Sequence, residues 1–317
     1  MHRRNIMENS QLLDVVRRPL SPDSQIEVPT SWEVFERVEE MEARDSNVAD
    51  RYPLLQYDAV RQIAIVVAAP TPLYTILLTV LMSNVCRNVN WQGLDENITD
   101  RLIFESEATE TTSGDSATRR ILNGAIRCKI NDLDRLLMIA FEVGVSQSYT
   151  SLKDAISYAI CVLHCPLFIT LCINERGRAG HQQAMNAAIQ QVENDFRMQP
   201  QDRPYGPLAA DGVTWFGRVS RVVLDVFRRE DIDYPEGTCL EPTRSFTIVR
   251  DGQYVGSHVS PNLVEVTLGD CIPAHLLVGN QIQTTPVNFF QQDWFESSFR
   301  HHVEDCTCTG HGQKKSF

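Results

Sequence analysis

The amino-acid sequence predicts an α/β protein with a mixed central sheet flanked by helices. Short apolar runs rich in β-branched residues, each bounded by turn residues, predict buried strands at Gln62–Ala68, Leu136–Phe141 and Leu167–Ile173. Between the last two runs, apolar residues recur at helical spacing from Tyr149 to Leu163. A strand, a helix and a second strand in this order indicate a right-handed crossover.

Composition and charge narrow the class of protein. The chain has 317 residues, of which 43% are hydrophobic and 22% charged, as in an ordinary soluble globular protein. The formal net charge of −12 argues against broad non-specific binding to nucleic acid, because phosphate neutralisation needs clustered Lys and Arg. A local basic cleft remains compatible with that charge.

Cysteine usage and the N-terminal sequence predict the compartment. The nine cysteines are an odd number at no regular spacing, and the first residues lead into no apolar segment of a secretory signal. We therefore expect free thiols in a reducing, intracellular compartment, either cytoplasmic or nuclear.

Two uncharged stretches raise the alternative of a membrane protein. Gln62–Cys86 and Ala155–Asn174 are each about long enough to span a bilayer. Pro70 and Pro72 interrupt the first stretch, and His164 and Pro166 interrupt the second. Each divides more naturally into one strand and one helix, so the sequence favours a protein with no membrane partner. One uninterrupted helix over the first stretch would revive the alternative.

The N-terminal half is predicted as an arm followed by the start of the core. Met1–Asp50 is polar and acidic, with a helical run at Trp32–Ala43 whose acidic side chains indicate a solvated face. The core domain is expected over residues 51–290. Thr71 as a cap and Pro72 at the first helical position predict a helix there. Its predicted buried face carries Leu73, Ile76, Leu77, Val80 and Leu81, and a further strand is predicted at Arg101–Thr111.

The C-terminal half is predicted as an insertion, further strands and a tail. The insertion covers about 176–212 and contains an exposed helix, His181–Arg197, followed by a proline-rich linker from Gln199 to Gly212. Asp251-Gly252 is a hairpin signal between two of the strands that follow. These strands are predicted at Val222–Phe227, Phe246–Val249 and Val264–Leu268, and an irregular tail at 291–317.

Two groups of cysteines and histidines have competing interpretations. The tail carries a Cys-x-Cys pair with histidines nearby, but Cys-x-x-Cys is the usual zinc spacing, so a fortuitous cluster is favoured. The residues of this cluster are His301, His302, Cys306, Cys308 and His311. Cys161, Cys165 and Cys172 fall on apolar faces and are predicted to be core residues.

The segment Phe141–Tyr149 carries the most specific motif, Phe-Glu-Val-Gly-Val-Ser-Gln-Ser-Tyr. A carboxylate at the end of a buried strand either caps the next turn, or is paired, or holds a metal. The motif resembles the PD-(D/E)XK restriction-endonuclease-like superfamily, and within it a fungal branch with the motif Glu-Val-Gly-x-Ser-Gln/Glu-Ser-Tyr. The match is close over Phe141–Tyr149 and looser over roughly Arg51–Asn174.

The resemblance implies a Mg²⁺-dependent nuclease site with two acids and a lysine, acting on DNA. Glu142 takes the place of the second acid. For the first acid two alignments compete. One places Asn123 on the family's Pro-Asp-Gly-x-x-Arg pattern, in Leu122–Arg127, and is favoured because the following residues also match. The other uses Asp115, which lies in a Ser-Gly-Asp-Ser turn.

The lysine departs from the family pattern as well. It normally lies two residues after the second acid, where this chain has Gly144, and Lys153 is the nearby candidate. A surface lysine beside Asp154 is the favoured interpretation of Lys153. An Asn at the first acid and a displaced lysine predict a degenerate phosphodiesterase site, with Mg²⁺ only if the site is active. The alternative is a non-catalytic module that binds a protein or nucleic-acid partner.

Overall fold

The computed structural model describes residues 11–18, 20, 24–45, 53–68, 72–91, 99–112, 117–132, 134–145, 149–176, 205–210, 213–229, 241–256, 266–277, 284–287, 290 and 292–300. Contacts between residues divide the chain into two compact units. The first contains residues 1–71 and 107–122, and the second contains residues 72–106 and 123–317.

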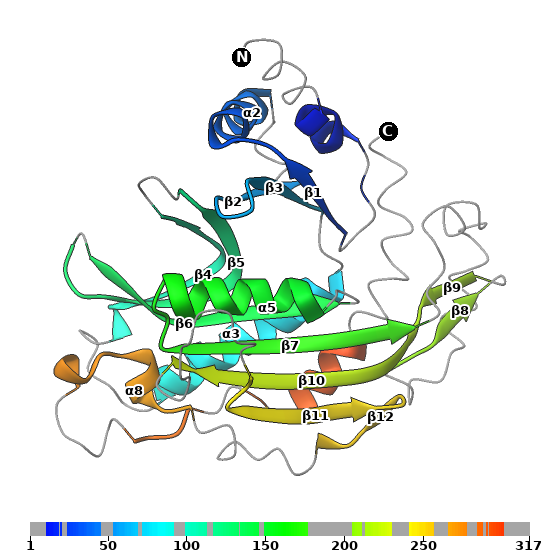
Figure 1. The fold of residues 1–317 in the computed structure, drawn as a ribbon. Helices are drawn as coiled ribbons and strands as arrows, with labels where there is room; N and C mark the ends of the chain where they lie inside the picture. Colours follow the sequence, from blue (N-terminus) through cyan, green and yellow to red (C-terminus); the bar gives the residue numbers. More distant parts are fainter. Residues whose placement is uncertain are drawn as a thin grey trace. The chain divides into compact units, whose positions relative to one another are not determined.

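The first unit is a small antiparallel sheet with an amphipathic helix (Figure 1). Its elements are β1 (Gln25–Pro29), α2 (Trp32–Asp45), β2 (Leu54–Asp58) and β3 (Ile63–Val67). β3 lies between β1 and β2 and pairs with both. Phe35 of α2 is fully buried and contacts Tyr57 of β2, with ring centroids 5.3 Å apart. The segment Met1–Asp50, which the sequence predicts to be a polar arm, thus supplies β1 and α2 of this unit.

The second unit is built on a mixed sheet in the order β5-β6-β7-β10-β11-β12. Its strands are β5 (Arg119–Lys129), β6 (Arg135–Val145), β7 (Leu167–Arg176), β10 (Arg218–Arg228), β11 (Arg244–Arg250) and β12 (Gln253–Tyr254). β4 (Leu102–Thr111) also pairs with β5, and both strands begin in one unit and end in the other. β6 and β7 are parallel, whereas the other pairs along this order are antiparallel. The predicted α/β class with a mixed sheet and flanking helices is confirmed.

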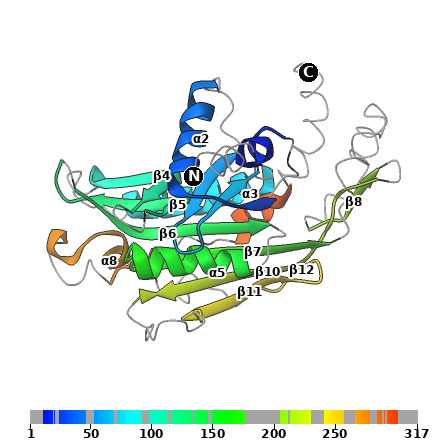
Figure 2. The ribbon, with the colours of Figure 1, turned by 45° about the horizontal axis from the view of Figure 1, so that its top comes forward.

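Helices lie on both sides of β6 and β7 (Figures 1 and 2). α3 (Pro72–Trp91) contributes Leu77, Leu81 and other residues to the main hydrophobic core. α5 (Tyr149–Ser157), followed by a π-helical turn at Tyr158–Val162, connects β6 to β7. This crossover agrees with the predicted strand–helix–strand unit and explains why these two strands are parallel.

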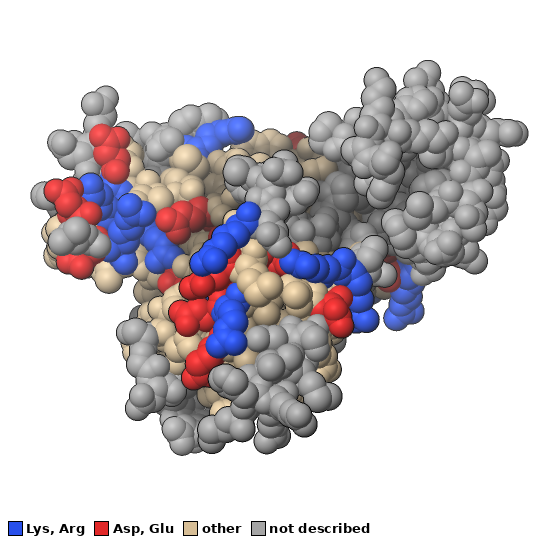
Figure 3. All heavy atoms as spheres, turned by 90° about the horizontal axis from the view of Figure 1, so that it is seen from above, with Lys and Arg blue, Asp and Glu red and all other residues tan. Residues whose placement is uncertain are grey.

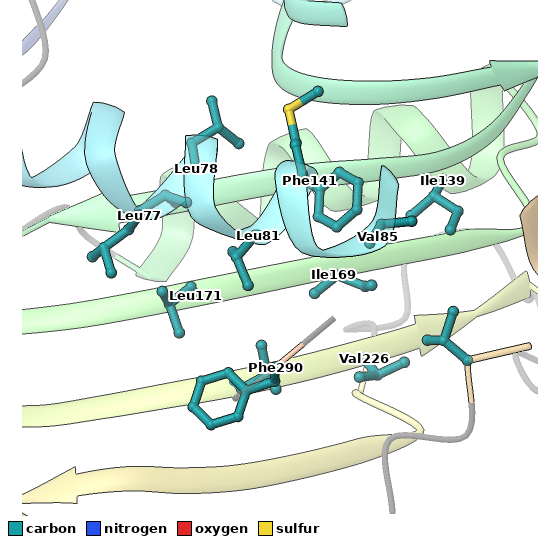
Figure 4. Close-up of a cluster of buried hydrophobic side chains, with 14 of the residues drawn as sticks. Leu77, Leu78, Leu81, Val85, Ile139, Phe141, Ile169, Leu171, Val226 and Phe290 are labelled. Atoms are coloured by element: carbon teal, nitrogen blue, oxygen red, sulfur yellow. The ribbon is translucent and has the colours of Figure 1, made fainter. Parts of the chain in front are cut away.

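The predicted helix after Pro70 exists, but its buried face is rotated from the prediction. Leu73, Leu77 and Leu81 are buried as expected, whereas Ile76 and Val80 are only half-buried. The additional buried positions are Tyr74, Leu78, Met82 and Val85. Figure 4 shows Leu77, Leu78, Leu81 and Val85 of α3 above the strands that carry Phe141, Ile169 and Val226. The predicted cap, Thr71, lies outside the described residues.

The stretch Gln62–Cys86 is not one helix, because it divides into β3 and the first part of α3. In the ranges that the structure describes, no helix is both long and apolar enough to cross a membrane. The strand next to β5 is β2, which pairs with it through Tyr57 and Arg119, and β3 lies on the far side of β2. The four-residue connection from β2 makes that strand the hairpin partner of β3.

Several C-terminal predictions need correction. Asp251-Gly252 forms a hairpin turn with both residues at positive φ, and this turn joins β11 to β12. Of the strand predicted at Val264–Leu268, the first two residues lie outside the described residues. Leu268 instead begins a short helix, α8 (Leu268–Cys271), because the Asp270 carboxylate accepts a hydrogen bond from the Thr267 N–H at 2.7 Å. The expected linker contains a strand, β8 (Leu208–Ala210), which pairs with β9 (Val213–Phe216).

The tail expected to be irregular is helical over residues 292–300. Its Cys and His cluster lies outside the described residues, as does the helix predicted at His181–Arg197. Six cysteines lie within the described residues, and none of them forms a disulfide. Cys165 and Cys172 are buried as predicted, whereas Cys161 is only half-buried.

Candidate functional site

Glu142 lies inside strand β6, not at its end, because the strand continues to Val145. Its neighbours Phe141 and Val143 belong to the hydrophobic core that includes α3. Successive side chains of a strand point to opposite faces, so Glu142 points to the other face, on the side of α5. Only 7% of its surface is exposed. The carboxylate is therefore an interior group of the sheet.

Asn123 of β5 lies beside Glu142. The pair Gly124 and Phe141 fixes the antiparallel register there, which brings the preceding and following residues together. The Asn123 backbone N–H donates a hydrogen bond to Glu142 Oε1 at 3.4 Å. Asn123 Oδ1 accepts a hydrogen bond from the Val143 N–H at 2.8 Å. The Asn123 amide oxygen is thus already engaged by the backbone of β6.

Gly124, the glycine of the Leu122–Arg127 pattern, has a packing reason to be glycine. A Cβ atom at this position would lie 2.7 Å from Met82 Sδ and 3.0 Å from Leu78 Cδ1, both on α3. These distances are too short for ordinary contacts, so a Cβ here would force the Met82 and Leu78 side chains to shift. The glycine thus leaves room for these two side chains of α3 against the sheet.

Arg127, the last residue of the same pattern, is tied to an acid on the neighbouring strand. Its Nε donates to Glu105 Oε2 at 2.7 Å, and the Glu105 carboxylate also lies 3.6 Å from Arg135 Nη1. These three residues link β4, β5 and β6. This ion pair, which is partly shielded from water, gives Arg127 a structural role that needs no ligand.

Lys153 is on α5, the helix on the same side of the sheet as Glu142. Its neighbour Leu152 is buried and Asp154 is exposed, and Lys153 itself is half-buried at the border between them. Leu152 and Ile156 form the buried side of the helix, as the sequence predicted. The Ser and Gln residues of the motif, at positions 146–148, lie outside the described residues, and so does Asp115.

The pair formed by Asn123 and Glu142 does not fit a two-acid magnesium centre. Asn123 brings no charge, and its one potential ligand oxygen accepts the Val143 N–H. Hard divalent cations favour several charged oxygens. Over the described part of the chain, no three His, Cys, Asp or Glu side chains come together as metal ligands. No catalytic step through Mg²⁺ is therefore derived for this pair.

Two polar residues on the same face were missed by the sequence analysis. Thr170 of β7 and Asp225 of β10 are 1% and 3% exposed. Both lie inside apolar runs, and a polar residue within a buried strand was the signal available to find them. Burial raises the pKa of the Asp225 carboxyl, while a hydrogen bond from Ser245 and the charge of Arg221 lower it and Glu241 raises it further.

Basic and acidic side chains are interleaved among the described residues on the face drawn in Figure 3. In the first unit, Arg120 pairs with Asp58 at 3.0 Å. In the second, Arg228 pairs with Asp270 at 2.6 Å. Arginines engaged with carboxylates leave less positive charge for phosphate groups than their number suggests.

Comparisons with family models, with curated proteins and with solved structures found no match to this chain. A relation to the PD-(D/E)XK superfamily therefore stays an inference from the motif at Phe141–Tyr149 and from the arrangement of the elements around it.

Proposed function

We propose that the chain is a restriction-endonuclease-like protein whose metal-dependent phosphodiesterase site is degenerate. The observation that carries the proposal is the hydrogen bond from the Val143 N–H to Asn123 Oδ1, 2.8 Å long. It gives the residue in the first-acid position a structural role between β5 and β6. An uncharged ligand already bound to the backbone is a poor substitute for a metal-binding carboxylate.

The arrangement around this pair supports the fold part of the proposal. An acid on β6, a crossover helix and the parallel strand β7 follow one another, as the resemblance implies. The departures lie in the chemistry, since Gly144 occupies the usual lysine position and Lys153 is displaced to α5. A fold can persist after its chemistry is lost.

The chain then acts by binding, and its partner is a protein rather than DNA. The net charge is −12, and arginines on both units are paired with acids. A nucleic-acid surface needs clustered cations that are available to phosphates. An acidic surface with interleaved charges is better suited to a protein partner that matches it in charge.

The first prediction is that the purified protein cleaves no plasmid DNA in Mg²⁺ or Mn²⁺. Supercoiled plasmid would be incubated with wild-type protein and with Glu142→Ala and Glu142→Gln, and the nicked and linear forms measured on a gel. All three proteins should give the same background. Cleavage by the wild type that both variants abolish would establish an active nuclease. Retarded but intact plasmid would make nucleic acid the partner.

A further inference from the structure

Four arginines lie together on one face of the sheet, over the neighbouring strands β7, β10 and β11 (Figure 1). In the register of the sheet, Arg176 of β7 is opposite Arg218 of β10, and Arg221 of β10 is opposite Arg250 of β11. Asn174, two residues before Arg176, is also opposite Arg221. Residues that are opposite one another, or two apart on one strand, point to the same face. We call these four arginines the arginine cluster.

The charges of the arginine cluster are not neutralised by acids. All four arginines are exposed, and over the described residues none of them forms an ion pair with a carboxylate. Arg218 donates from Nη2 to the Asp251 carbonyl oxygen, which is a neutral acceptor and adds no negative charge. Glu175, the acid within this part of β7, points to the other face, where its carboxylate accepts from the Gly217 N–H at 2.6 Å.

This arrangement costs stability, because like charges directly opposite one another destabilise a sheet. Two such pairs are present, although the chain has 41 Asp and Glu against 29 Lys and Arg. Asp225 is the acid further along β10 on the same face, but it is buried, and the charge of Arg221 acts on it without an ion pair. Unpaired arginines held together on an acidic chain indicate an anionic ligand that comes from outside the chain.

The size of the arginine cluster fits a short acidic segment. Guanidinium groups bind carboxylates through two parallel hydrogen bonds, which makes arginine well suited to such a ligand. With strands about 4.8 Å apart, the cluster is about 10 Å across, and alternate side chains of an extended segment are about 6.6 Å apart. Two or three carboxylates therefore reach it at once. A DNA duplex would extend beyond the cluster, over a chain whose net charge of −12 repels it.

We propose that the arginine cluster is the docking surface for an acidic segment of a protein partner. This inference rests on the binding function proposed above, and it names the chemistry of the partner. The carboxylates of the segment pair with Arg176, Arg218, Arg221 and Arg250 and relieve the repulsion between the opposed arginines. Binding is driven by charge at an exposed surface, so it weakens as the salt concentration rises.

The test measures the binding of a defined acidic peptide to the full chain. A fluorescein-labelled peptide of alternating glutamate and serine, about ten residues long, would be titrated with the protein while its fluorescence anisotropy is recorded. The wild type should bind one peptide per chain, more weakly at about 0.15 M salt than at low salt. Arg250→Glu should weaken binding at least tenfold. It should also raise the unfolding midpoint, because it turns the like-charge pair with Arg221 into a pair of opposite charges.

Arg44→Glu is the matched control, because it makes the same change of net charge at an exposed arginine that already pairs with Glu40, at 3.5 Å. This variant should bind the peptide as the wild type does, and a peptide with glutamine in place of glutamate should not bind. Arg176→Gln, which removes a charge without reversing it, should weaken binding at least threefold. It replaces Arg250→Glu if circular dichroism shows that the latter does not fold.

Three results would overturn the proposal. They are no saturable binding of the peptide by the wild type, binding that Arg250→Glu and Arg176→Gln retain, and tighter binding of a single-stranded oligonucleotide than of the peptide. Plasmid cleavage that the Glu142 variants abolish is read in a separate assay and would contradict only the degenerate site. The two failures are therefore distinguishable.

Discussion

Replacing Phe141 by Ala is expected to lower the free energy of unfolding by about 3–5 kcal/mol. The side chain is fully buried and belongs to the core beneath α3 (Figure 4). Its removal leaves a cavity between the helix and the sheet that the α3 side chains Leu78 and Leu81 cannot fill without moving the backbone. The neighbouring strands are central in the sheet, so collapse around the cavity is limited.

Urea denaturation followed by circular dichroism measures the effect of Phe141→Ala. Phe141→Leu, which keeps much of the volume, should lose less than half as much stability. Leu136→Ala is a control on the same strand, because Leu136 is 47% exposed and its truncation should have little effect. If Phe141→Ala and Leu136→Ala proved equally mild, the packing of α3 against β6 described above would be wrong.

Replacing Asp270 by Ala is expected to lower the free energy of unfolding by about 2–3 kcal/mol. Its two carboxylate oxygens accept from Arg228 Nη1 and Nη2 at 2.6 and 3.1 Å, which is a bidentate ion pair with both side chains mostly buried. The same carboxylate accepts from the Thr267 N–H and starts α8. The variant therefore loses an ion pair and a helix cap together, and leaves the guanidinium without this acid.

Two variants separate these contributions. Asp270→Asn keeps an oxygen for the Thr267 N–H but removes the charge, so its loss of stability should be intermediate. Asp132→Ala breaks the exposed pair with Lys129, 2.8 Å long, and should leave the unfolding midpoint unchanged. A midpoint for Asp270→Ala equal to that of the wild type would show that the pair with Arg228 does not hold α8 to β10.

The sequence predicts the fold best where the apolar periodicity agrees with the positions of residues that break helices and strands. The predictions are best for β6, α5 and β7, which correspond to Leu136–Phe141, the helical spacing from Tyr149, and Leu167–Ile173. Two of these are clear apolar runs, and Pro166 separates the helix from the second run. Partners in the sheet are harder to predict. The neighbour of β3 depends on a hairpin with β2, a short strand whose sequence carries little apolar pattern.

Local hydrogen bonds explain the other errors. Leu268 ends a run with the composition of a strand, but Thr267 and Asp270 form a helix start there. Glu142 was expected where the strand ends, yet the strand continues through Gly144 to Val145 because β7 pairs along that whole length. A single charged residue does not end a strand when a neighbouring backbone N–H can bond to it.

The candidate site was predictable only in part. Placing Asn123 next to Glu142 follows from an alignment of two motifs, and the structure brings the two residues together. The direction of the Asn123 amide, toward the Val143 N–H, depends on the register of β5 and β6, which no local pattern carries. Thr170 and Asp225 each stand out as a polar residue within an apolar run, but their proximity arises only from the pairing of β7 with β10.

We propose that Asn123 is a structural residue beside the Glu142 carboxylate, which would leave the phosphodiesterase site degenerate. The most direct measurement is a crystal structure of the wild-type protein grown with Mg²⁺ or Mn²⁺. We expect Asn123 Oδ1 to accept the Val143 N–H, at about the 2.8 Å found here, with no cation between Asn123 and Glu142. A cation shared by Glu142 and either Asn123 or Asp115, about 2.0–2.6 Å from their oxygens, would contradict it.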